Sequence, residues 1–214
     1  GDTVVTWTVT DGSGNTATAT QTITVVDDID PTITAPTAVT VNVDAASCEA
    51  TGVDLGLPTT ADNCSVASTT SDAPVAFSLG DTVVTWTVTD GSGNTATATQ
   101  TITVVDNIDP TITVTDITVN VDAASCEATG VDLGLPTTAD NCSVASTTSD
   151  APVAFSLGDT VVTWTVTDGS GNTATATQTI TVVDDIDPTI TAPTAVTVNV
   201  DAASCEATGV DLGL

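Results

Sequence analysis

The residues of this chain that could do chemistry are aspartates, and they gather at a point that recurs. The stretch "TVVDDIDPTIT" at residues 24–34 packs three aspartates into four positions. It returns as "TVVDNIDPTIT" at 103–113 and as "TVVDDIDPTIT" at 181–191. The chain has no lysine, arginine or histidine, and its formal net charge is −28. Because neighbouring carboxylates repel one another, the pattern predicts a cationic partner, and a divalent metal ion is the simplest one.

The composition excludes several classes of function. Nucleic-acid binding requires Lys and Arg for the phosphates, and the chain has neither. It also lacks the side chains for a Ser–His pair, a Schiff-base lysine or an anion clamp. Carboxylate pairs remain, but they lie in polar turns where nothing raises a pKa. No apolar run reaches the roughly 18 residues of a membrane helix. We therefore expect no enzyme, no nucleic-acid partner and no membrane-spanning segment here.

An internal repeat dominates the sequence. The segment at 1–27 recurs without change at 80–106 and 158–184. The resulting period, near 78 residues, suits a small domain better than a solenoid unit. Asp-Pro steps mark the boundaries, because proline forces extended backbone on itself and on the residue before it. We predict the C-terminal part of a repeat at 1–29, whole repeats at 30–107 and 108–185, and the N-terminal part of another at 186–214. Such ends suggest a longer array.

Each repeat is patterned as β-strands. Val5, Trp7 and Val9 alternate with threonines, and so do the small and branched residues of 17–25. A period of two in β-branched residues indicates strands with one buried and one wet face. "TDGSGNT" between these segments is typical of a hairpin turn in which Gly12 and Gly14 take positive φ. About seven short strands per repeat predict an all-β fold of tandem immunoglobulin-like β-sandwiches, arranged as beads on a string.

Five cysteines occur, and their spacing follows the repeat. Cys48 and Cys64 are 16 residues apart, as are Cys126 and Cys142, while Cys205 corresponds to Cys48. Two cysteines in each small domain predict one disulfide per repeat, worth roughly 3 kcal/mol for a loop of this length. Buried free thiols are the alternative. A zinc site is not expected, because each repeat offers only two thiolates and no histidine as ligands. Disulfides imply an oxidising compartment, outside the cell or on its surface.

The repeat resembles the hyalin-repeat (HYR) domain. The resemblance rests on Phe77, on Leu79-Gly80, on the strand from Val84 to Thr87, on the Thr89–Asn94 turn and on the strand from Thr99 to Val105. Ser78 and Trp86 depart from the family's usual proline and tyrosine, and Ala35 and Ala98 stand where many relatives carry cysteines. The resemblance implies an immunoglobulin-like fold and an extracellular role in adhesion. Near-identical tandem copies favour the bacterial members, found in long surface adhesins.

The sandwich layout places the recurring aspartates beside two loops of the following domain, "ADNC" and "DGSGN". Several oxygens then converge, and calcium takes 6–8 oxygen ligands with flexible geometry. The expected structural calcium ligands are the aspartates of these linkers and loops: Asp27, Asp28, Asp30, Asp62, Asp90, Asp106, Asp109, Asp140, Asp168, Asp184, Asp185 and Asp187. Calcium stiffens such a junction. The alternative is that the aspartates only form turns and a solvated acidic surface.

The "DTV" triplets resemble an acceptor motif for O-glycosylation, with candidate sites at Thr3, Thr82 and Thr160. Ordinary β-propensity explains the same threonines.

Together these features predict a structural repeat region of an extracellular bacterial filament, stalk or adhesin shaft that supports adhesion or gliding. Its expected partners are the neighbouring repeats of the same chain, with like chains in a fibre and surface glycans left open. The alternative is a multivalent glycan- or protein-binding module in which the repeats themselves bind.

Overall fold

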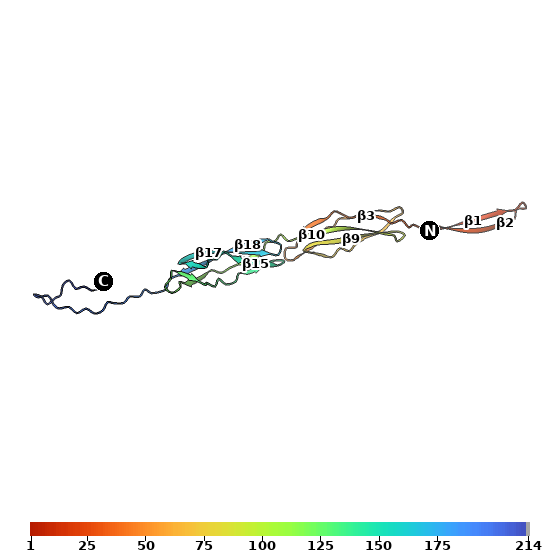
Figure 1. Ribbon diagram of the computed structural model, residues 1–214. Coiled ribbons are helices and arrows are strands. Elements are labelled where there is room, and N and C mark those ends of the chain that lie inside the picture. The colour runs from red at the N-terminus through yellow and green to blue at the C-terminus, as the bar shows by residue number, and fades with distance from the viewer. Residues whose placement is uncertain (213–214) are drawn as a thin grey trace. The chain divides into compact units, whose positions relative to one another are not determined.

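A computed structural model describes residues 1–212, and every regular element assigned in that range is a β-strand (Figure 1). The all-β fold expected from the alternating pattern is confirmed. No helix in the described residues could cross a lipid bilayer.

The strands follow the sequence repeat. An N-terminal hairpin pairs β1 (Asp2–Thr10) with β2 (Thr16–Thr24). The eight strands of the next repeat are β3 (Thr32–Thr34), β4 (Val39–Asn42), β5 (Glu49–Thr51), β6 (Thr59–Ala61), β7 (Val66–Ser71), β8 (Ala76–Ser78), β9 (Gly80–Asp90) and β10 (Thr95–Val105). The same eight recur as β11 (Thr111–Thr113), β12 (Ile117–Asn120), β13 (Glu127–Thr129), β14 (Thr137–Ala139), β15 (Val144–Ser149), β16 (Ala154–Ser156), β17 (Gly158–Asp168) and β18 (Thr173–Val183).

Each set of eight strands forms an immunoglobulin-like sandwich. One layer is a four-stranded sheet in the order β4-β10-β9-β7, in which β4 runs parallel to β10. The other layer consists of two short antiparallel pairs, β3 with β6 and β5 with β8. The second set repeats this arrangement as β12-β18-β17-β15 with β11-β14 and β13-β16. In both sets the longest strands form the central hairpin, which ends in the "DGSGN" turn.

The core comes from the alternating face of the central hairpin. Val84, Trp86 and Val88 of β9 are buried, and Ile102 and Val104 of β10 are buried beside them. Phe77 is buried from the opposite layer, because β8 pairs with β5 rather than with the large sheet. The intervening threonines remain at least partly exposed. The period-two pattern therefore predicts the buried face of this hairpin correctly.

A buried glutamine ties the two layers together. Gln100 of β10 is only 2% exposed. Its side-chain amide donates to the carbonyls of Thr37 (2.8 Å) and Leu55 (3.0 Å), and its oxygen accepts from Trp86 Nε1 (3.1 Å). Since a buried polar group is costly unless bonded, this network fixes the two irregular segments against the sheet.

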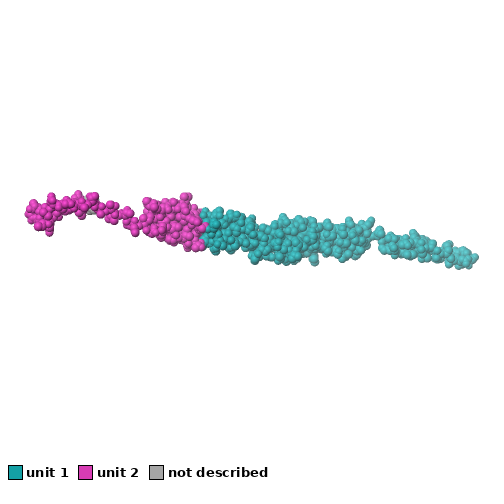
Figure 2. All heavy atoms as spheres, turned by 90° about the horizontal axis from the view of Figure 1, so that it is seen from below, with its two compact units in different colours: residues 1–114, 135–149, 163–176 teal, residues 115–134, 150–162, 177–214 magenta. Residues whose placement is uncertain are grey.

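Contacts divide the chain into two compact units (Figure 2). Unit 1 comprises residues 1–114, 135–149 and 163–176, and unit 2 comprises 115–134, 150–162 and 177–214. Strands β17 and β18 continue from one unit into the other. The repeat boundaries and the beads-on-a-string arrangement predicted from the sequence stay predictions.

The partial repeat at the N-terminus behaves differently from the complete ones. Trp7 of the β1–β2 hairpin is 63% exposed, whereas the equivalent Trp86 is 8% exposed. Both faces of this hairpin are largely exposed among the described residues, whereas the equivalent hairpin of β9 and β10 has one buried face. The "DGSGN" turn nevertheless forms in the hairpin, with Gly14 at φ +89°. Gly12, which the sequence allows to take positive φ, does not have it.

Candidate cation and disulfide site at the repeat junction

Three aspartates from three separate segments converge where one repeat meets the next. Asp106 follows β10, Asp140 follows β14, and Asp168 ends β17. One carboxylate oxygen from each lies within 4.8 Å of the others. Asp27, Asp62 and Asp90 form the same cluster one repeat earlier. All six residues belong to unit 1.

Local hydrogen bonds set the direction of the Asp168 carboxylate. Its Oδ1 accepts from the backbone N–H of Ser170 (2.9 Å) and of Asn172 (2.7 Å), and its Oδ2 accepts from the Asn172 side chain (2.7 Å). Gly171, at φ +96°, gives the turn the left-handed residue it needs. The same bonds hold Asp11 in the N-terminal hairpin, so the turn alone orients this carboxylate.

The other two carboxylates are each fixed through one oxygen and left unpaired at the second. Asp140 Oδ2 accepts from the backbone of Cys142 (2.9 Å) and Ser143 (2.8 Å), which leaves Oδ1 without a partner. Asp106 Oδ1 accepts from Ile108 N (3.1 Å) and the Asn141 amide (3.3 Å), which leaves Oδ2 without one. The Asn141 oxygen is also buried and unpaired.

These unpaired atoms are informative because buried polar atoms normally have partners. Here three of them, on Asp106, Asp140 and Asn141, are oxygens in or beside the carboxylate cluster. Oxygens that surround one calcium ion at 2.3–2.6 Å lie within about 5 Å of one another, which matches the observed clustering. The donor set is all oxygen and carries three negative charges, so it fits a hard divalent cation.

An asparagine anchors the linker onto the cluster. The Asn172 amide donates to the carbonyls of Asp106 (3.2 Å) and Ile108 (3.4 Å). Asn94 makes the equivalent bonds to Asp27 and Ile29, at 3.2 and 3.3 Å. The turn that orients one carboxylate therefore also positions the segment that carries another.

Hydrogen bonding favours the charged form of one carboxylate in the Asp106–Asp140–Asp168 cluster and of two in the earlier one. Burial by itself raises the pKa of Asp168, but the Asn172 side chain and the backbone N–H groups of the turn outweigh it and lower the pKa. Asp90 is held low in the same way. At the first cluster the Asn63 amide, followed by the Ile29 N–H, lowers the pKa of Asp27. These hydrogen bonds favour the charged form of Asp27, Asp90 and Asp168, and the chain has no cationic side chain to compensate.

The two clusters differ in how well they are covered. Asp106 is 8% exposed, and Asn141 beside it is half-buried. At the first cluster Asp27 is half-buried and Asn63 is exposed. The difference arises because the Asn141 amide also donates to the carbonyl of Ser47 (3.1 Å), on the loop before β5 of the preceding repeat. The N-terminal hairpin has no such loop.

The structure gathers half of the aspartates that the sequence nominated. Asp27, Asp62 and Asp90 form one cluster, and Asp106, Asp140 and Asp168 form the other. The exposed linker aspartates Asp28, Asp30 and Asp109 belong to neither. Asp184, Asp185 and Asp187 join no cluster among the described residues, and Asp185 instead accepts from the Asn120 side chain (2.7 Å). Sequence reasoning placed the asparagines of these two loops, Asn63 and Asn94, near the linker aspartates, but it did not predict the bonds by which Asn172 anchors the linker.

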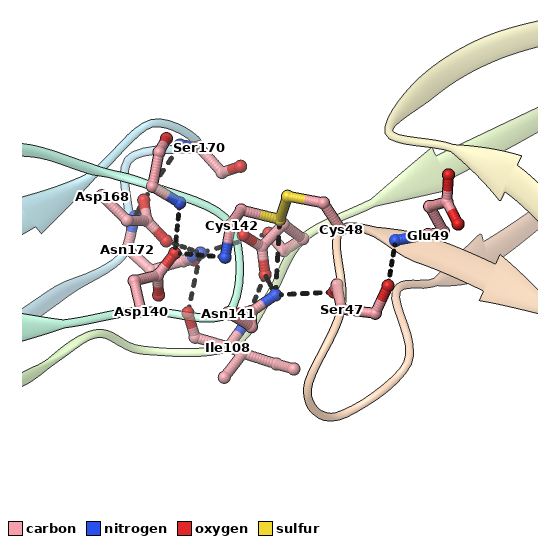
Figure 3. Close-up of a disulfide and its surroundings, with 12 residues drawn as sticks. Ser47, Cys48, Glu49, Ile108, Asp140, Asn141, Cys142, Asp168, Ser170 and Asn172 are labelled. Atoms are coloured by element: carbon pink, nitrogen blue, oxygen red, sulfur yellow. Dashed lines mark hydrogen bonds between the residues drawn. A yellow bond between two sulfur atoms is a disulfide. The ribbon is translucent and has the colours of Figure 1, made fainter.

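The disulfide links two successive repeats rather than the two cysteines of one repeat (Figure 3). Cys48 is bonded to Cys142, with 4.8 Å between their Cα atoms and 94 residues between them in sequence. Cys64, Cys126 and Cys205 are free and exposed. The pairings expected from the spacing of 16 residues, Cys48 with Cys64 and Cys126 with Cys142, are therefore wrong.

The reason for the different pairing is the topology of the sandwich. The loop that carries Cys48 connects β4 to β5, and the loop that carries Cys64 connects β6 to β7. The Cys48 loop meets the Cys142 loop, which is the equivalent of the Cys64 loop in the next repeat. The two loops are joined there by the hydrogen bond from the Asn141 amide to the Ser47 carbonyl. Because the repeats are nearly identical, a disulfide within one repeat and a disulfide between two repeats join the same two sequence positions of the repeat. The spacing of the cysteines therefore could not distinguish the two pairings.

The proposed glycosylation sites lie on strands at the start of each long hairpin. Thr3 is exposed, and Thr82 and Thr160 are half-buried. Their modification stays a prediction.

No family model matches the chain. Two curated relatives do match it, both named hyalin. The protein from Lytechinus variegatus is 40% identical over 198 residues, covering 86% of this chain and 37% of the relative. The protein from Strongylocentrotus purpuratus is 38% identical over 205 residues, covering 89% of this chain and 17% of the relative.

The chain is similar to these two proteins over most of its own length, which supports a hyalin-repeat-like domain. It spans well under half the length of the relatives it matches. Both relatives are sea urchin proteins, so they give no support to the bacterial origin expected above.

Among solved structures, the chain is similar to protocadherin gamma C5 EC1-3, with a TM-score of 0.38 and 12% identity over 84% of this chain and 77% of that one. It is also similar to protocadherin gamma B7 extracellular cadherin domains 1-4, with a TM-score of 0.37 and 12% identity. That match covers 81% of this chain and 56% of the protocadherin chain.

Proposed function

We propose that this hyalin-repeat-like segment is a structural spacer of an extracellular adhesive filament or stalk, and that calcium at each repeat junction holds successive sandwiches together. The observation that carries the proposal is the Asp106–Asp140–Asp168 cluster with its unpaired, buried oxygens. Without a cation, the three carboxylates of such a cluster repel one another. When a cation is bound, the same carboxylates hold the linker to the two loops.

The binding set follows from the atoms left free. Asp106 Oδ2, Asp140 Oδ1 and Asn141 Oδ1 would contribute directly, with Asp168 supplying the third carboxylate and water the remaining positions. Because Asp106 belongs to the linker and Asp140 and Asp168 to the following sandwich, the ion would couple the linker to that sandwich. Calcium suits the site better than magnesium, since it accepts irregular oxygen geometry.

An extracellular location is supported by the disulfide, which persists only in an oxidising compartment. It is also supported by the hyalin-like sequence. The surface of the chain offers no lysine or arginine, so trypsin-like proteases have no cleavage site.

Small-angle X-ray scattering of the oxidised chain tests the spacer role. We expect the spread of conformations to narrow when calcium replaces a chelator, and we expect Asp106→Asn to remove the difference. The control is Asp28→Asn, at an exposed linker aspartate outside the cluster, which should respond as the unaltered chain does. Scattering curves that do not change with calcium would refute the coupling.

Binding by the repeats themselves stays the competing prediction. Beads coated with this chain alone test it: saturable attachment to immobilised glycans or to cells would favour a binding module over a spacer.

A further inference from the structure

The loop that carries Cys48 recurs around Cys126 with the same closing hydrogen bonds. In both copies the loop is closed by the same bonds, from Asp44 N to the Glu49 carbonyl and from Asp122 N to the Glu127 carbonyl, each 2.8 Å long. The side chain of Asp122 accepts from Thr129, as that of Asp44 does from Thr51. The loop therefore keeps these hydrogen bonds whether or not its cysteine has a partner.

The two copies differ in covering and, at one residue, in backbone: Ala124 has φ +61°, whereas its equivalent Ala46 does not have positive φ. Ser47 and Cys48 are half-buried, whereas Ser125 and Cys126 are exposed. The exposed pair lines a recess of about 250 Å³, together with Ala124 and a linker wall formed by Asp184, Ile186, Asp187 and Pro188. In the occupied junction, the equivalents of this wall contact the Asp-Asn-Cys loop of the next repeat, with Asp106 Oδ1 accepting from Asn141.

We propose that the recess beside Cys126 is a receptor for the Asp-Asn-Cys loop of another copy of this repeat, and that Cys126 captures its cysteine as a disulfide. The occupied junction specifies the contacts. The asparagine amide of the incoming loop donates to the Ser125 carbonyl, as Asn141 does to Ser47, and to Asp184, as it does to Asp106. Each repeat thus carries one receptor cysteine and one loop cysteine.

Cys64 is the free loop cysteine of this chain. In the capture step, the Cys126 thiolate attacks the sulfur of a loop cysteine held in a mixed disulfide. One S–S bond forms, the other breaks, and the displaced thiol leaves, so no further oxidant is required.

The test uses the full chain and a synthetic peptide of residues 59–67, "TTADNCSVA", whose cysteine carries a thionitrobenzoate leaving group. Mass spectrometry then measures how fast each of the three free thiols acquires the peptide, in calcium and in a chelator. Cys205 is the internal control, because its loop has the same sequence and the same Asp201–Thr208 bonds. Cys205 does not line the Cys126 recess.

We expect the peptide to modify Cys126 about five-fold faster than Cys205, the effect of roughly one net hydrogen bond. A peptide with alanine in place of its asparagine should lose this preference, and Cys126→Ser should remove the product. The rates at which a small neutral disulfide reacts with Cys126 and Cys205 give the intrinsic reactivities of the two thiols. The peptide rates are divided by these values. Equal corrected rates in both buffers, or an equal preference for the alanine peptide, would overturn the receptor assignment. A preference in chelator alone would support it independently of calcium.

Discussion

Replacing both cysteines of the Cys48–Cys142 bond by serine should destabilise the chain strongly, whereas replacing Cys64 should not. The bond closes a segment of 94 residues that includes most of β5 to β14 and the first cross-repeat contacts. Breaking it frees two sandwiches to unfold without a shared covalent constraint.

The magnitude follows from the length of the closed segment. In the chain-entropy description, a loop of 94 residues contributes about 4.7 kcal/mol, against roughly 3 kcal/mol for a loop of 16 residues. Since one kcal/mol shifts the melting temperature of a protein of this size by roughly 2–4 °C, the double variant should melt roughly 10–20 °C lower.

Thermal denaturation followed by circular dichroism measures this shift. The matched control is Cys64→Ser, at an exposed free thiol, which should change stability by no more than about 0.5 kcal/mol. If the bonds instead closed within each repeat, Cys64→Ser would remove one of them. A control variant that melts as low as the Cys48/Cys142 double variant, or a double variant that melts with the unaltered chain, would refute the pairing between repeats.

Two further predictions concern buried polar groups. Gln100→Leu should cost about 2–3 kcal/mol in urea denaturation, because it leaves the carbonyls of Thr37 and Leu55 and the Trp86 N–H without partners. Gln21→Leu, which alters the equivalent but exposed contact with Trp7, should change stability by less than about 0.5 kcal/mol, and an equal loss at both positions would contradict the network. Acid should also destabilise the chain: the folded pKa values of Asp90 and Asp168 lie below the ordinary 3.8, so their stabilisation is present above that pH and is lost as the pH falls through the folded values. Asp90→Asn and Asp168→Asn should flatten the fall in melting temperature below about pH 4, and an unchanged profile would refute this cause.

The fold could be predicted well from the sequence because its information is local. Alternation in β9 and β10 identifies the buried face, and the "DGSGN" turn specifies the hairpin between them. The Gln100 network could not be predicted, since its partners at Thr37 and Leu55 lie in irregular segments far along the chain. The alternation places Gln100 on the same face as Ile102 and Val104, but it does not indicate which groups its amide would bond.

The candidate site was predicted in kind but not in detail. Linker and loop aspartates do meet, yet among the linker aspartates only Asp27 and Asp106 join the clusters. The bond from the N–H two residues later does not suffice to bring a carboxylate inward, because Asp184 accepts the same bond from Ile186 and is exposed. The prediction of the cysteine pairing failed for a different reason. A repeated sequence does not show whether a contact is made within one copy or between one copy and the next.

Isothermal titration of the oxidised chain with calcium tests the central claim most directly. We predict binding at about 1 mM or tighter, with the better-covered Asp106 cluster filling before the Asp27 cluster. Asp106→Asn should remove the tighter event and Asp27→Asn the weaker one, while Asp28→Asn should leave both. No heat of binding, or an equal loss in the Asp28→Asn control, would contradict the account and leave the aspartates as turn formers on an acidic surface.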